Sequence, residues 1–131
     1  MPPSGTFALT KAERITGRTM VDALFRGGQS RSVPYYPLRA VYRMMPYSGA
    51  AVRVLFSVPK RYMHHAIDRN HVKRQMREAY RLNKHILYDV MAAHENETLT
   101  VAFIWQGQKS ESSEGMAKRM VNILTRISDK I

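Results

Sequence analysis

Apolar residues repeat along this chain with two different periods, and the change of period limits the folds that the chain can adopt. Residues 35–44, 50–58 and 98–105 alternate apolar with other side chains, a period of two that predicts strands. Residues 68–93 and 114–128 place apolar residues three or four positions apart, which predicts two amphipathic helices. This order of elements predicts an α+β fold, a two-layer sandwich of a small sheet with helices on one face and the other face partly open.

The segment between the first two predicted strands is typical of a turn. Pro46-Tyr47-Ser48-Gly49 combines residue types that favour turns, so the strands on either side are expected to pair as a hairpin. Arg39 and Arg43 lie on the same face of the first of these strands and make that face basic. A shorter strand earlier in the chain, or a split within residues 33–44, remains an alternative, since pattern places strand ends only to within a few residues.

Local signals also indicate where the remaining elements begin. Residues 1–8 lack periodicity and are expected to form a mobile N-terminal leader. Thr10 and Glu13 have the spacing of a capping box, which predicts a short helix at that point. Residues 19–26 predict a further helix, and Asp68 is expected to be the N-cap of the long helix.

The length of 131 residues fits a single domain over residues 9–131, and the composition excludes several kinds of chemistry. The chain has no cysteine, which excludes disulfides, thiolate zinc sites, iron–sulfur clusters and thiol nucleophiles. No apolar run reaches the roughly 18–20 residues that a membrane-spanning helix needs, and none resembles a signal peptide. A soluble protein of the reducing cytoplasm is expected.

The net charge of +11 is unusual for a chain of this size and is unevenly distributed. Residues 1–94 contain 16 Lys and Arg against 5 Asp and Glu, whereas residues 95–131 contain five of each kind. The excess is densest between Lys60 and Lys84, where eight basic residues face only Asp68 and Glu78. Such a surplus favours an anionic partner, and nucleic acid is the leading candidate.

Basic residues in the long predicted helix follow its own repeat. Arg69, Lys73 and Arg77 are spaced by four and therefore stack on one face, Arg81 and Lys84 extend the row, and Arg74 lies beside it. Like charges at this spacing repel each other, so a helix that needed only stability would contain more Glu on that face. A solvated face that serves only solubility is the alternative to an RNA-binding row.

Aromatic and histidine residues near the basic segment suggest nucleic-acid contacts more than enzyme chemistry. Phe25 and Tyr36 are candidates for stacking on unpaired bases, whereas Phe56 belongs to an alternating apolar row and is expected to be buried. His64, His65 and His71 lack a carboxylate cluster, so neither a metal site nor a catalytic residue is predicted in this chain.

Two stretches together resemble the signature region of the bacterial ribonuclease P protein subunit. They are Ser57-Val58-Pro59-Lys60-Arg61, at the end of a predicted strand, and the run from Arg69 to Arg81, which reads RNHVKRQMREAYR. Residues 15–30 are similar to the first helix of that family, and length and element order agree from about residue 9 to 128. The resemblance implies a fold similar to the second domain of ribosomal protein S5, with a mixed sheet and a left-handed crossover around the basic helix.

The resemblance also implies a function. The protein is expected to bind the catalytic RNA subunit and precursor tRNA and to support removal of the 5′ leader, a step of tRNA processing. Ribonuclease P would then be a ribonucleoprotein endonuclease whose catalytic site and magnesium ions belong to the RNA, with no cofactor bound by the protein. No membrane and no small-molecule substrate is expected among its partners.

Two sets of site residues follow from the resemblance. The expected leader-binding cleft comprises Phe25, Tyr36 and Arg39. The expected RNA-binding residues are Lys60, Arg61, Arg69, Asn70, His71, Lys73, Arg74, Arg77 and Arg81. His71 stands where the family usually has Arg, and Val21 where Phe is frequent. A ribosomal or RNA-chaperone protein of the same fold and a protein-only nuclease are the alternatives, and the latter would need a metal–carboxylate cluster that the sequence does not show.

Overall fold

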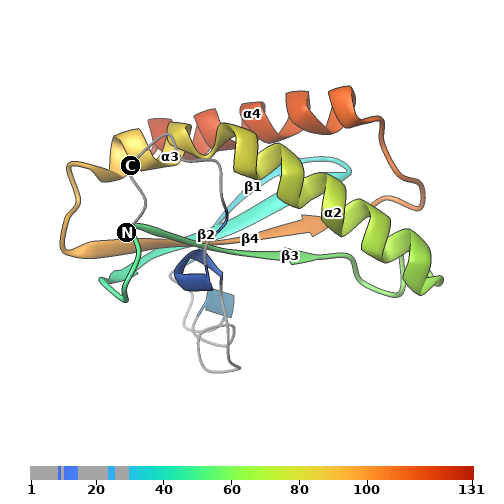
Figure 1. The fold of residues 1–131 in the computed structure, drawn as a ribbon, viewed down its shortest axis with the longest axis horizontal. Helices are drawn as coiled ribbons and strands as arrows, with labels where there is room; N and C mark the ends of the chain where they lie inside the picture. The colour runs from blue at the N-terminus through green and yellow to red at the C-terminus, as the bar shows by residue number, and fades with distance from the viewer. Residues whose placement is uncertain (1–8, 10, 15–23, 26–29) are drawn as a thin grey trace.

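A computed structural model describes residues 9, 11–14, 24–25 and 30–131, and these form a sheet with helices above it (Figure 1). The elements are a short 3-10 helix η1 (Lys11–Glu13), strands β1 (Arg31–Tyr35), β2 (Leu38–Pro46) and β3 (Val52–Ser57), helices α2 (Ala66–Asn83) and α3 (His85–Met91), strand β4 (Glu97–Trp105) and helix α4 (Ser113–Asp129). The predicted α+β sandwich is confirmed. None of the described helices is long and apolar enough to cross a membrane.

The sheet has the order β1-β2-β4-β3, in which β4 runs antiparallel to β2 and parallel to β3. The expected hairpin between residues 35–44 and 50–58 is therefore wrong, because β4 lies between these strands. Residues 98–103 of β4 are buried without a break, and such a strand is stable in the interior of a sheet rather than at its edge. The split within residues 33–44 is confirmed, since β1 and β2 form the hairpin instead.

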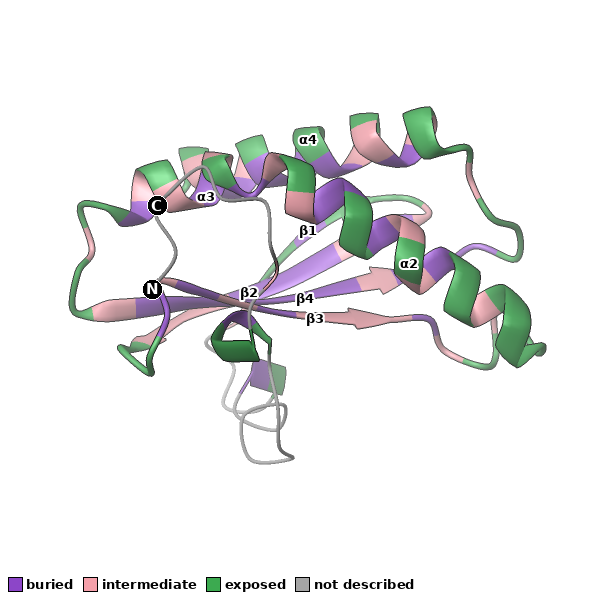
Figure 2. Cartoon of the chain, viewed as in Figure 1, coloured by how far each residue is buried: buried purple, intermediate pink, exposed green. Residues whose placement is uncertain are grey.

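The main core lies between the sheet and helices α2, α3 and α4, and the residues coloured as buried in Figure 2 lie along all of these elements. Val72 and Met76 of α2 and Met116, Met120 and Leu124 of α4 are fully buried there. A second, smaller cluster lies on the other face of the sheet, where Leu24 packs with Val41 and Ala102. That face is thus covered in part by the short helical segment of Leu24 and Phe25.

The long helix predicted over residues 68–93 differs from the structure at its start and near its middle. It begins at Ala66 with His65 as N-cap, so Asp68 lies in the first turn instead of capping it. It is interrupted at Lys84, whose carbonyl accepts hydrogen bonds from the amides of both Leu87 and Tyr88. Those two bonds tighten the turn that separates α2 from α3.

The expected capping box at the N-terminus stays a prediction, because Thr10 lies outside the described residues. Residues 11–13 form one helical turn, and Glu13 is buried with its carboxylate bound to Lys84 and Tyr88. The expected N-terminal leader, Thr10 and most of the helix expected over residues 19–26 lie outside the described residues.

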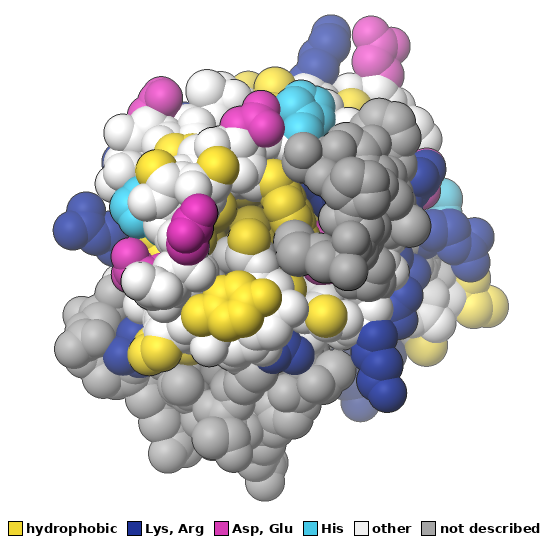
Figure 3. Space-filling view, turned by 60° about the vertical axis from the view of Figure 1, so that its left-hand side comes forward, with side chains coloured by type: hydrophobic (Ala, Val, Ile, Leu, Met, Phe, Trp, Pro, Cys, Tyr) yellow, Lys and Arg dark blue, Asp and Glu magenta, His cyan; other side chains and the backbone are white. Residues whose placement is uncertain are grey.

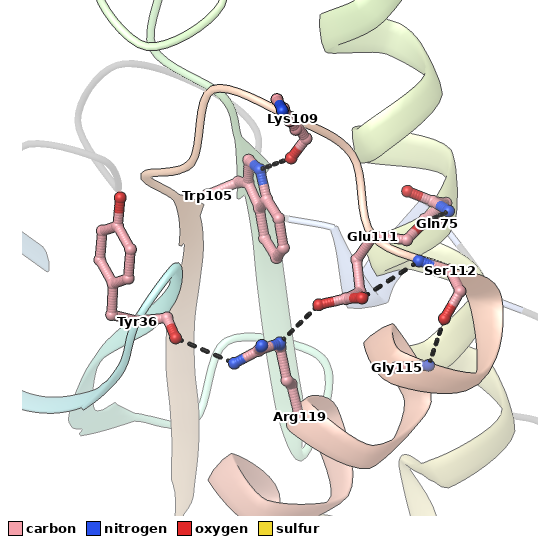
Figure 4. A network of polar contacts seen from close by, with 8 residues as sticks. All are labelled: Tyr36, Gln75, Trp105, Lys109, Glu111, Ser112, Gly115 and Arg119. Atoms are coloured by element: carbon pink, nitrogen blue, oxygen red, sulfur yellow. Dashed lines mark hydrogen bonds and ion pairs between the residues drawn. The ribbon is translucent and has the colours of Figure 1, made fainter.

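Side-chain contacts anchor the connection between β4 and α4 (Figure 4). The Trp105 indole donates to the Lys109 carbonyl at 3.1 Å. Arg119 donates to the Glu111 carboxylate at 3.0 Å and to the Tyr36 carbonyl at 2.9 Å. Ser112 caps α4 by accepting a hydrogen bond from the Gly115 amide. These contacts hold the connection beside α2. Gln75, near the middle of α2, donates a hydrogen bond to the Glu111 carbonyl of the connection.

Candidate nucleic-acid interface

The basic segment begins in the loop between β3 and α2. Lys60 and Arg61 are exposed there, and the Arg61 guanidinium lies 4.9 Å from the centre of the Tyr62 ring. Arg69, in the first turn of α2, is half-buried and donates to the carbonyls of Met63 at 3.0 Å and His64 at 2.7 Å. Arg69 thus fixes the loop that presents the two exposed cations, although the sequence placed it only within the row.

Further along α2, four predicted residues face solvent: Asn70, His71, Arg74 and Arg77. Lys73 is half-buried because it lies over strand β3, where it lines a hollow together with Arg77. None of the ion pairs between described residues includes Lys60, Arg61, Lys73, Arg74 or Arg77. The space-filling view shows Lys and Arg side chains gathered along one edge, away from most of the Asp and Glu (Figure 3). We call Lys60, Arg61, Lys73, Arg74 and Arg77 the cationic row.

The row is shorter than the helical spacing predicted. Arg81 forms an ion pair with Glu78, one turn earlier on the exposed side of α2, and this hydrogen bond lowers the pKa of the Glu78 carboxyl. The expected extension to Lys84 is wrong, because that side chain turns into the interior and pairs with buried Glu13. The charge of Lys84 is therefore neutralised by Glu13 in the interior of the protein.

The structure places the three expected leader-cleft residues in different surroundings. Phe25 is 49% exposed and follows Leu24, which packs on the second face of the sheet. Arg39 is half-buried, lies on the same face of β2 as Val41, and donates to the Ser32 hydroxyl at 2.8 Å. Phe25 and Arg39 therefore belong to the same side of the sheet.

Tyr36 lies in the turn between β1 and β2 and is 73% exposed. Its carbonyl is held by Arg119, and its ring points away from that side chain (Figure 4). Neither a ring contact nor a hydrogen bond joins Tyr36 to Phe25 among the described residues. Val21, the expected departure from the family pattern, lies outside the described residues.

Sequence reasoning missed one neighbour of the basic segment. Gln108 and Lys109, in the β4–α4 connection, line the same small hollows as His64, His71 and Asp68 at the start of α2. No local signal could have found this proximity, because some 40 residues of helix and strand separate the two loops. The described residues contain no group of three or more His, Asp or Glu that could hold a metal ion.

Fold and surface together define a class of protein: a small α+β sandwich that presents a row of cations on a helix beside the edge of a mixed sheet.

The family model described as Ribonuclease P matches residues 9–128. The whole chain is 36% identical to the ribonuclease P protein component of Porphyromonas gingivalis strain ATCC 33277 and covers 94% of that protein. It is 37% identical to the component of strain W83, over 99% of this chain and 92% of that protein. A stretch of 97 residues, 66% of this chain, is 38% identical to the component of Chlorobaculum tepidum and covers 58% of it. The chain therefore belongs to the ribonuclease P protein family, which confirms the resemblance found in the basic segment.

Proposed function

We propose that this chain is the protein subunit of ribonuclease P and that it binds the catalytic RNA subunit and the 5′ leader of precursor tRNA. In this role it supports endonucleolytic removal of the leader during tRNA maturation. The observation that carries the proposal is the cationic row, whose five members have no acidic partner among the described ion pairs. Membership of the family supports RNA as the ligand class of that surface.

The chemistry of the row suits RNA backbones. Each Lys or Arg that neutralises a phosphate releases a condensed counterion, so binding strengthens with the number of contacts and weakens steeply with salt. The same cations reduce the repulsion between phosphates where leader and RNA subunit come together. The RNA then binds its magnesium ions at a lower concentration.

The division of labour follows from the side chains that the site offers. Magnesium ions held by the RNA subunit supply the cleavage chemistry, and the protein binds no cofactor, membrane or small-molecule substrate. Phe25, Tyr36 and Arg39 form the leader contacts, and Asn70, His71 and Arg81 add to the contacts of the row. The protein acts in the cytoplasm, where tRNA precursors are processed.

Reconstitution tests the proposal. The purified chain is mixed with the matching RNA subunit and a precursor tRNA labelled in its 5′ leader, and cleavage is measured over a series of magnesium concentrations. We expect the chain to lower the magnesium requirement and to be inactive without the RNA. Cleavage by the protein alone would indicate a protein nuclease, and a chain that leaves the magnesium requirement unchanged would indicate a ribosomal or chaperone role; either result overturns the proposal.

A matched pair of variants connects the activity to the row. Changing Lys73, Arg74 and Arg77 together to Ala should raise the magnesium requirement. The control changes Lys118, an exposed lysine on α4, to Ala and should leave the requirement as it is. If both variants behave like the wild type, the row does not act in this way.

A further inference from the structure

A hollow of about 220 Å³ lies at the β3 edge of the sheet, between strand β3 and helix α2. Its apolar wall consists of Leu9, Val54, Leu55 and Phe56, and its cationic wall of Arg14, Lys73 and Arg77. Pockets for drug-sized ligands measure about 300–1,000 Å³, so this hollow suits a single planar group better than a larger molecule.

One face of the Phe56 ring is covered by Phe103, and the other face is directed toward the β3 edge of the sheet. Its ring stacks on Phe103 of β4, its register partner, with centroids 5.5 Å apart and planes 14° apart. Tyr80 of α2 meets it edge-on at 5.9 Å. Because Phe103 lies on the inner neighbouring strand, the opposite face of the Phe56 ring points away from β4, toward the hollow. The ring is half-buried, whereas the sequence pattern predicted that it is buried.

Strand β3 forms the edge of the sheet on this side. Among the described residues, its outer side is bridged only by Arg14, opposite Val54, two residues before the ring. The side chain of Arg53 holds the Arg14 carbonyl at 3.1 Å and fixes that bridge. Among the described residues, no such bridge forms at Phe56.

Lys73 and Arg77 complete the site from above. They lie one turn apart on α2 and both line the hollow with Phe56. An aromatic face beside two cations one helical turn apart matches the chemistry of an unpaired nucleotide, whose base stacks on a ring while its phosphates meet Lys or Arg. An uncharged apolar ligand would leave both cations without a partner.

We propose that Phe56 stacks with one unpaired RNA base on its outer ring face while Lys73 and Arg77 bind the phosphates on either side of that nucleotide. This inference rests on the proposed function and specifies the ligand of the same surface. The nucleotide belongs either to the precursor leader or to a single-stranded part of the RNA subunit.

The first test compares two substitutions of the ring by their affinity for a leader-length single-stranded RNA. Phe56→Leu keeps an apolar side chain in the core but removes the stacking face, and we expect its affinity to fall roughly fivefold or more. Phe56→Tyr keeps the ring and should bind within about twofold of the wild type. Circular dichroism and thermal melting establish that both variants are folded. Equal affinities of the Leu variant and the wild type would overturn the inference.

The second test uses the wild-type chain and is independent of folding. Ultraviolet crosslinking to RNA is followed by trypsin digestion, which releases residues 54–60 as one peptide with Phe56 as its only aromatic residue. One sample contains the leader oligonucleotide and the other contains the RNA subunit alone, so the sample that crosslinks identifies the source of the nucleotide. A crosslink at Phe56 in either sample supports the inference. Crosslinks on α2 peptides without one at Phe56 would overturn it.

Failure here is distinguishable from failure of the proposed function. Normal stimulation of cleavage by the wild type, with no change in RNA affinity for Phe56→Leu, rejects the stacking site and leaves the function intact. A wild-type chain that crosslinks through Phe56 but does not stimulate cleavage rejects the function and keeps the stacking site.

Discussion

Lys84 Nζ lies 2.9 Å from Glu13 Oε2 and 3.1 Å from Glu13 Oε1, although 71 residues separate the two. Both side chains are buried, and the Tyr88 hydroxyl also donates to the same carboxylate. The pair joins η1 to the junction of α2 and α3. Since Arg14, the residue after η1, bridges Val54, the pair also holds the N-terminal segment against the edge of β3.

Removing one member of this pair should be strongly destabilising. Lys84→Met leaves the Glu13 carboxylate buried without its cation, and losing one partner of a buried pair costs about 3–5 kcal/mol in free energy of unfolding. The double variant Glu13→Leu, Lys84→Met should regain much of that loss. Urea unfolding measures all three proteins, with Lys118→Met as the control, because the Lys118–Glu114 pair is exposed and worth about 0–1 kcal/mol. Similar losses for Lys84→Met and Lys118→Met would contradict the expectation.

The periodicity of the sequence predicts the type and extent of several elements but not their pairing. Residues 98–105 and 114–128 were expected as strand and helix, and the structure has Glu97–Trp105 and Ser113–Asp129. Periodicity reports which side of an element is apolar, and that is a local property. The position of β4 between β2 and β3 depends on contacts between distant segments, which explains why the expected hairpin was wrong.

The same distinction applies to the basic surface. Spacing correctly places Arg74 and Arg77 on an exposed face of α2, since that depends only on the helical repeat. The pairing of Arg81 with Glu78 is visible in the sequence as a spacing of three. The partner of Lys84 lies 71 residues away, and no local pattern indicates it.

Arg69 and Arg74 are both basic residues of α2, yet their substitution should have different effects. Arg69→Ala loses the bonds to the Met63 and His64 carbonyls, so unfolding should become easier by about 1.5 kcal/mol. Arg74→Ala should leave stability nearly unchanged. It should reduce the slope of log affinity against log salt by about 0.7, the value for one phosphate contact on a single strand. The comparison needs urea unfolding and RNA titrations at several salt concentrations. A larger slope change for Arg69→Ala than for Arg74→Ala would show that Arg69 is the phosphate contact.

Removing the negative charge of Glu78 should strengthen RNA binding. In the folded protein this carboxylate neutralises Arg81, which lies one helical turn beyond Arg77 of the cationic row. Glu78→Gln keeps the size of the side chain, and an exposed pair of this kind is worth a roughly twofold to fivefold change in affinity at low salt. Glu114→Gln, on α4, is the matched control because it removes an equal charge from an exposed pair far from the row in sequence. An equal gain in both variants would indicate an effect of net charge alone.

Tyr80 should make the fold sensitive to alkaline pH. Burial raises the pKa of its hydroxyl well above the usual value near 10, with smaller contributions from Tyr88 and Glu13. Above pH 10 the unfolded chain loses this proton while the folded protein keeps it, so stability is complete below pH 10 and falls as pH rises further, by up to about 1.4 kcal/mol per pH unit for each such tyrosine. Tyr80→Phe should reduce this fall. Part of it should remain, because burial and the bond to Glu13 also raise the pKa of Tyr88.

At neutral pH the same substitution should have little effect, within about 1 kcal/mol, because the Tyr80 hydroxyl has no hydrogen-bond partner among the described residues. Urea unfolding between pH 7 and about pH 11 measures both effects. Tyr47→Phe is the control, since that tyrosine is 53% exposed and should leave the alkaline fall unchanged. If the free energy of unfolding of Tyr80→Phe falls above pH 10 as steeply as that of the wild type and of Tyr47→Phe, the expectation is contradicted. The Tyr80 hydroxyl would then ionise in the folded protein as readily as in the unfolded chain.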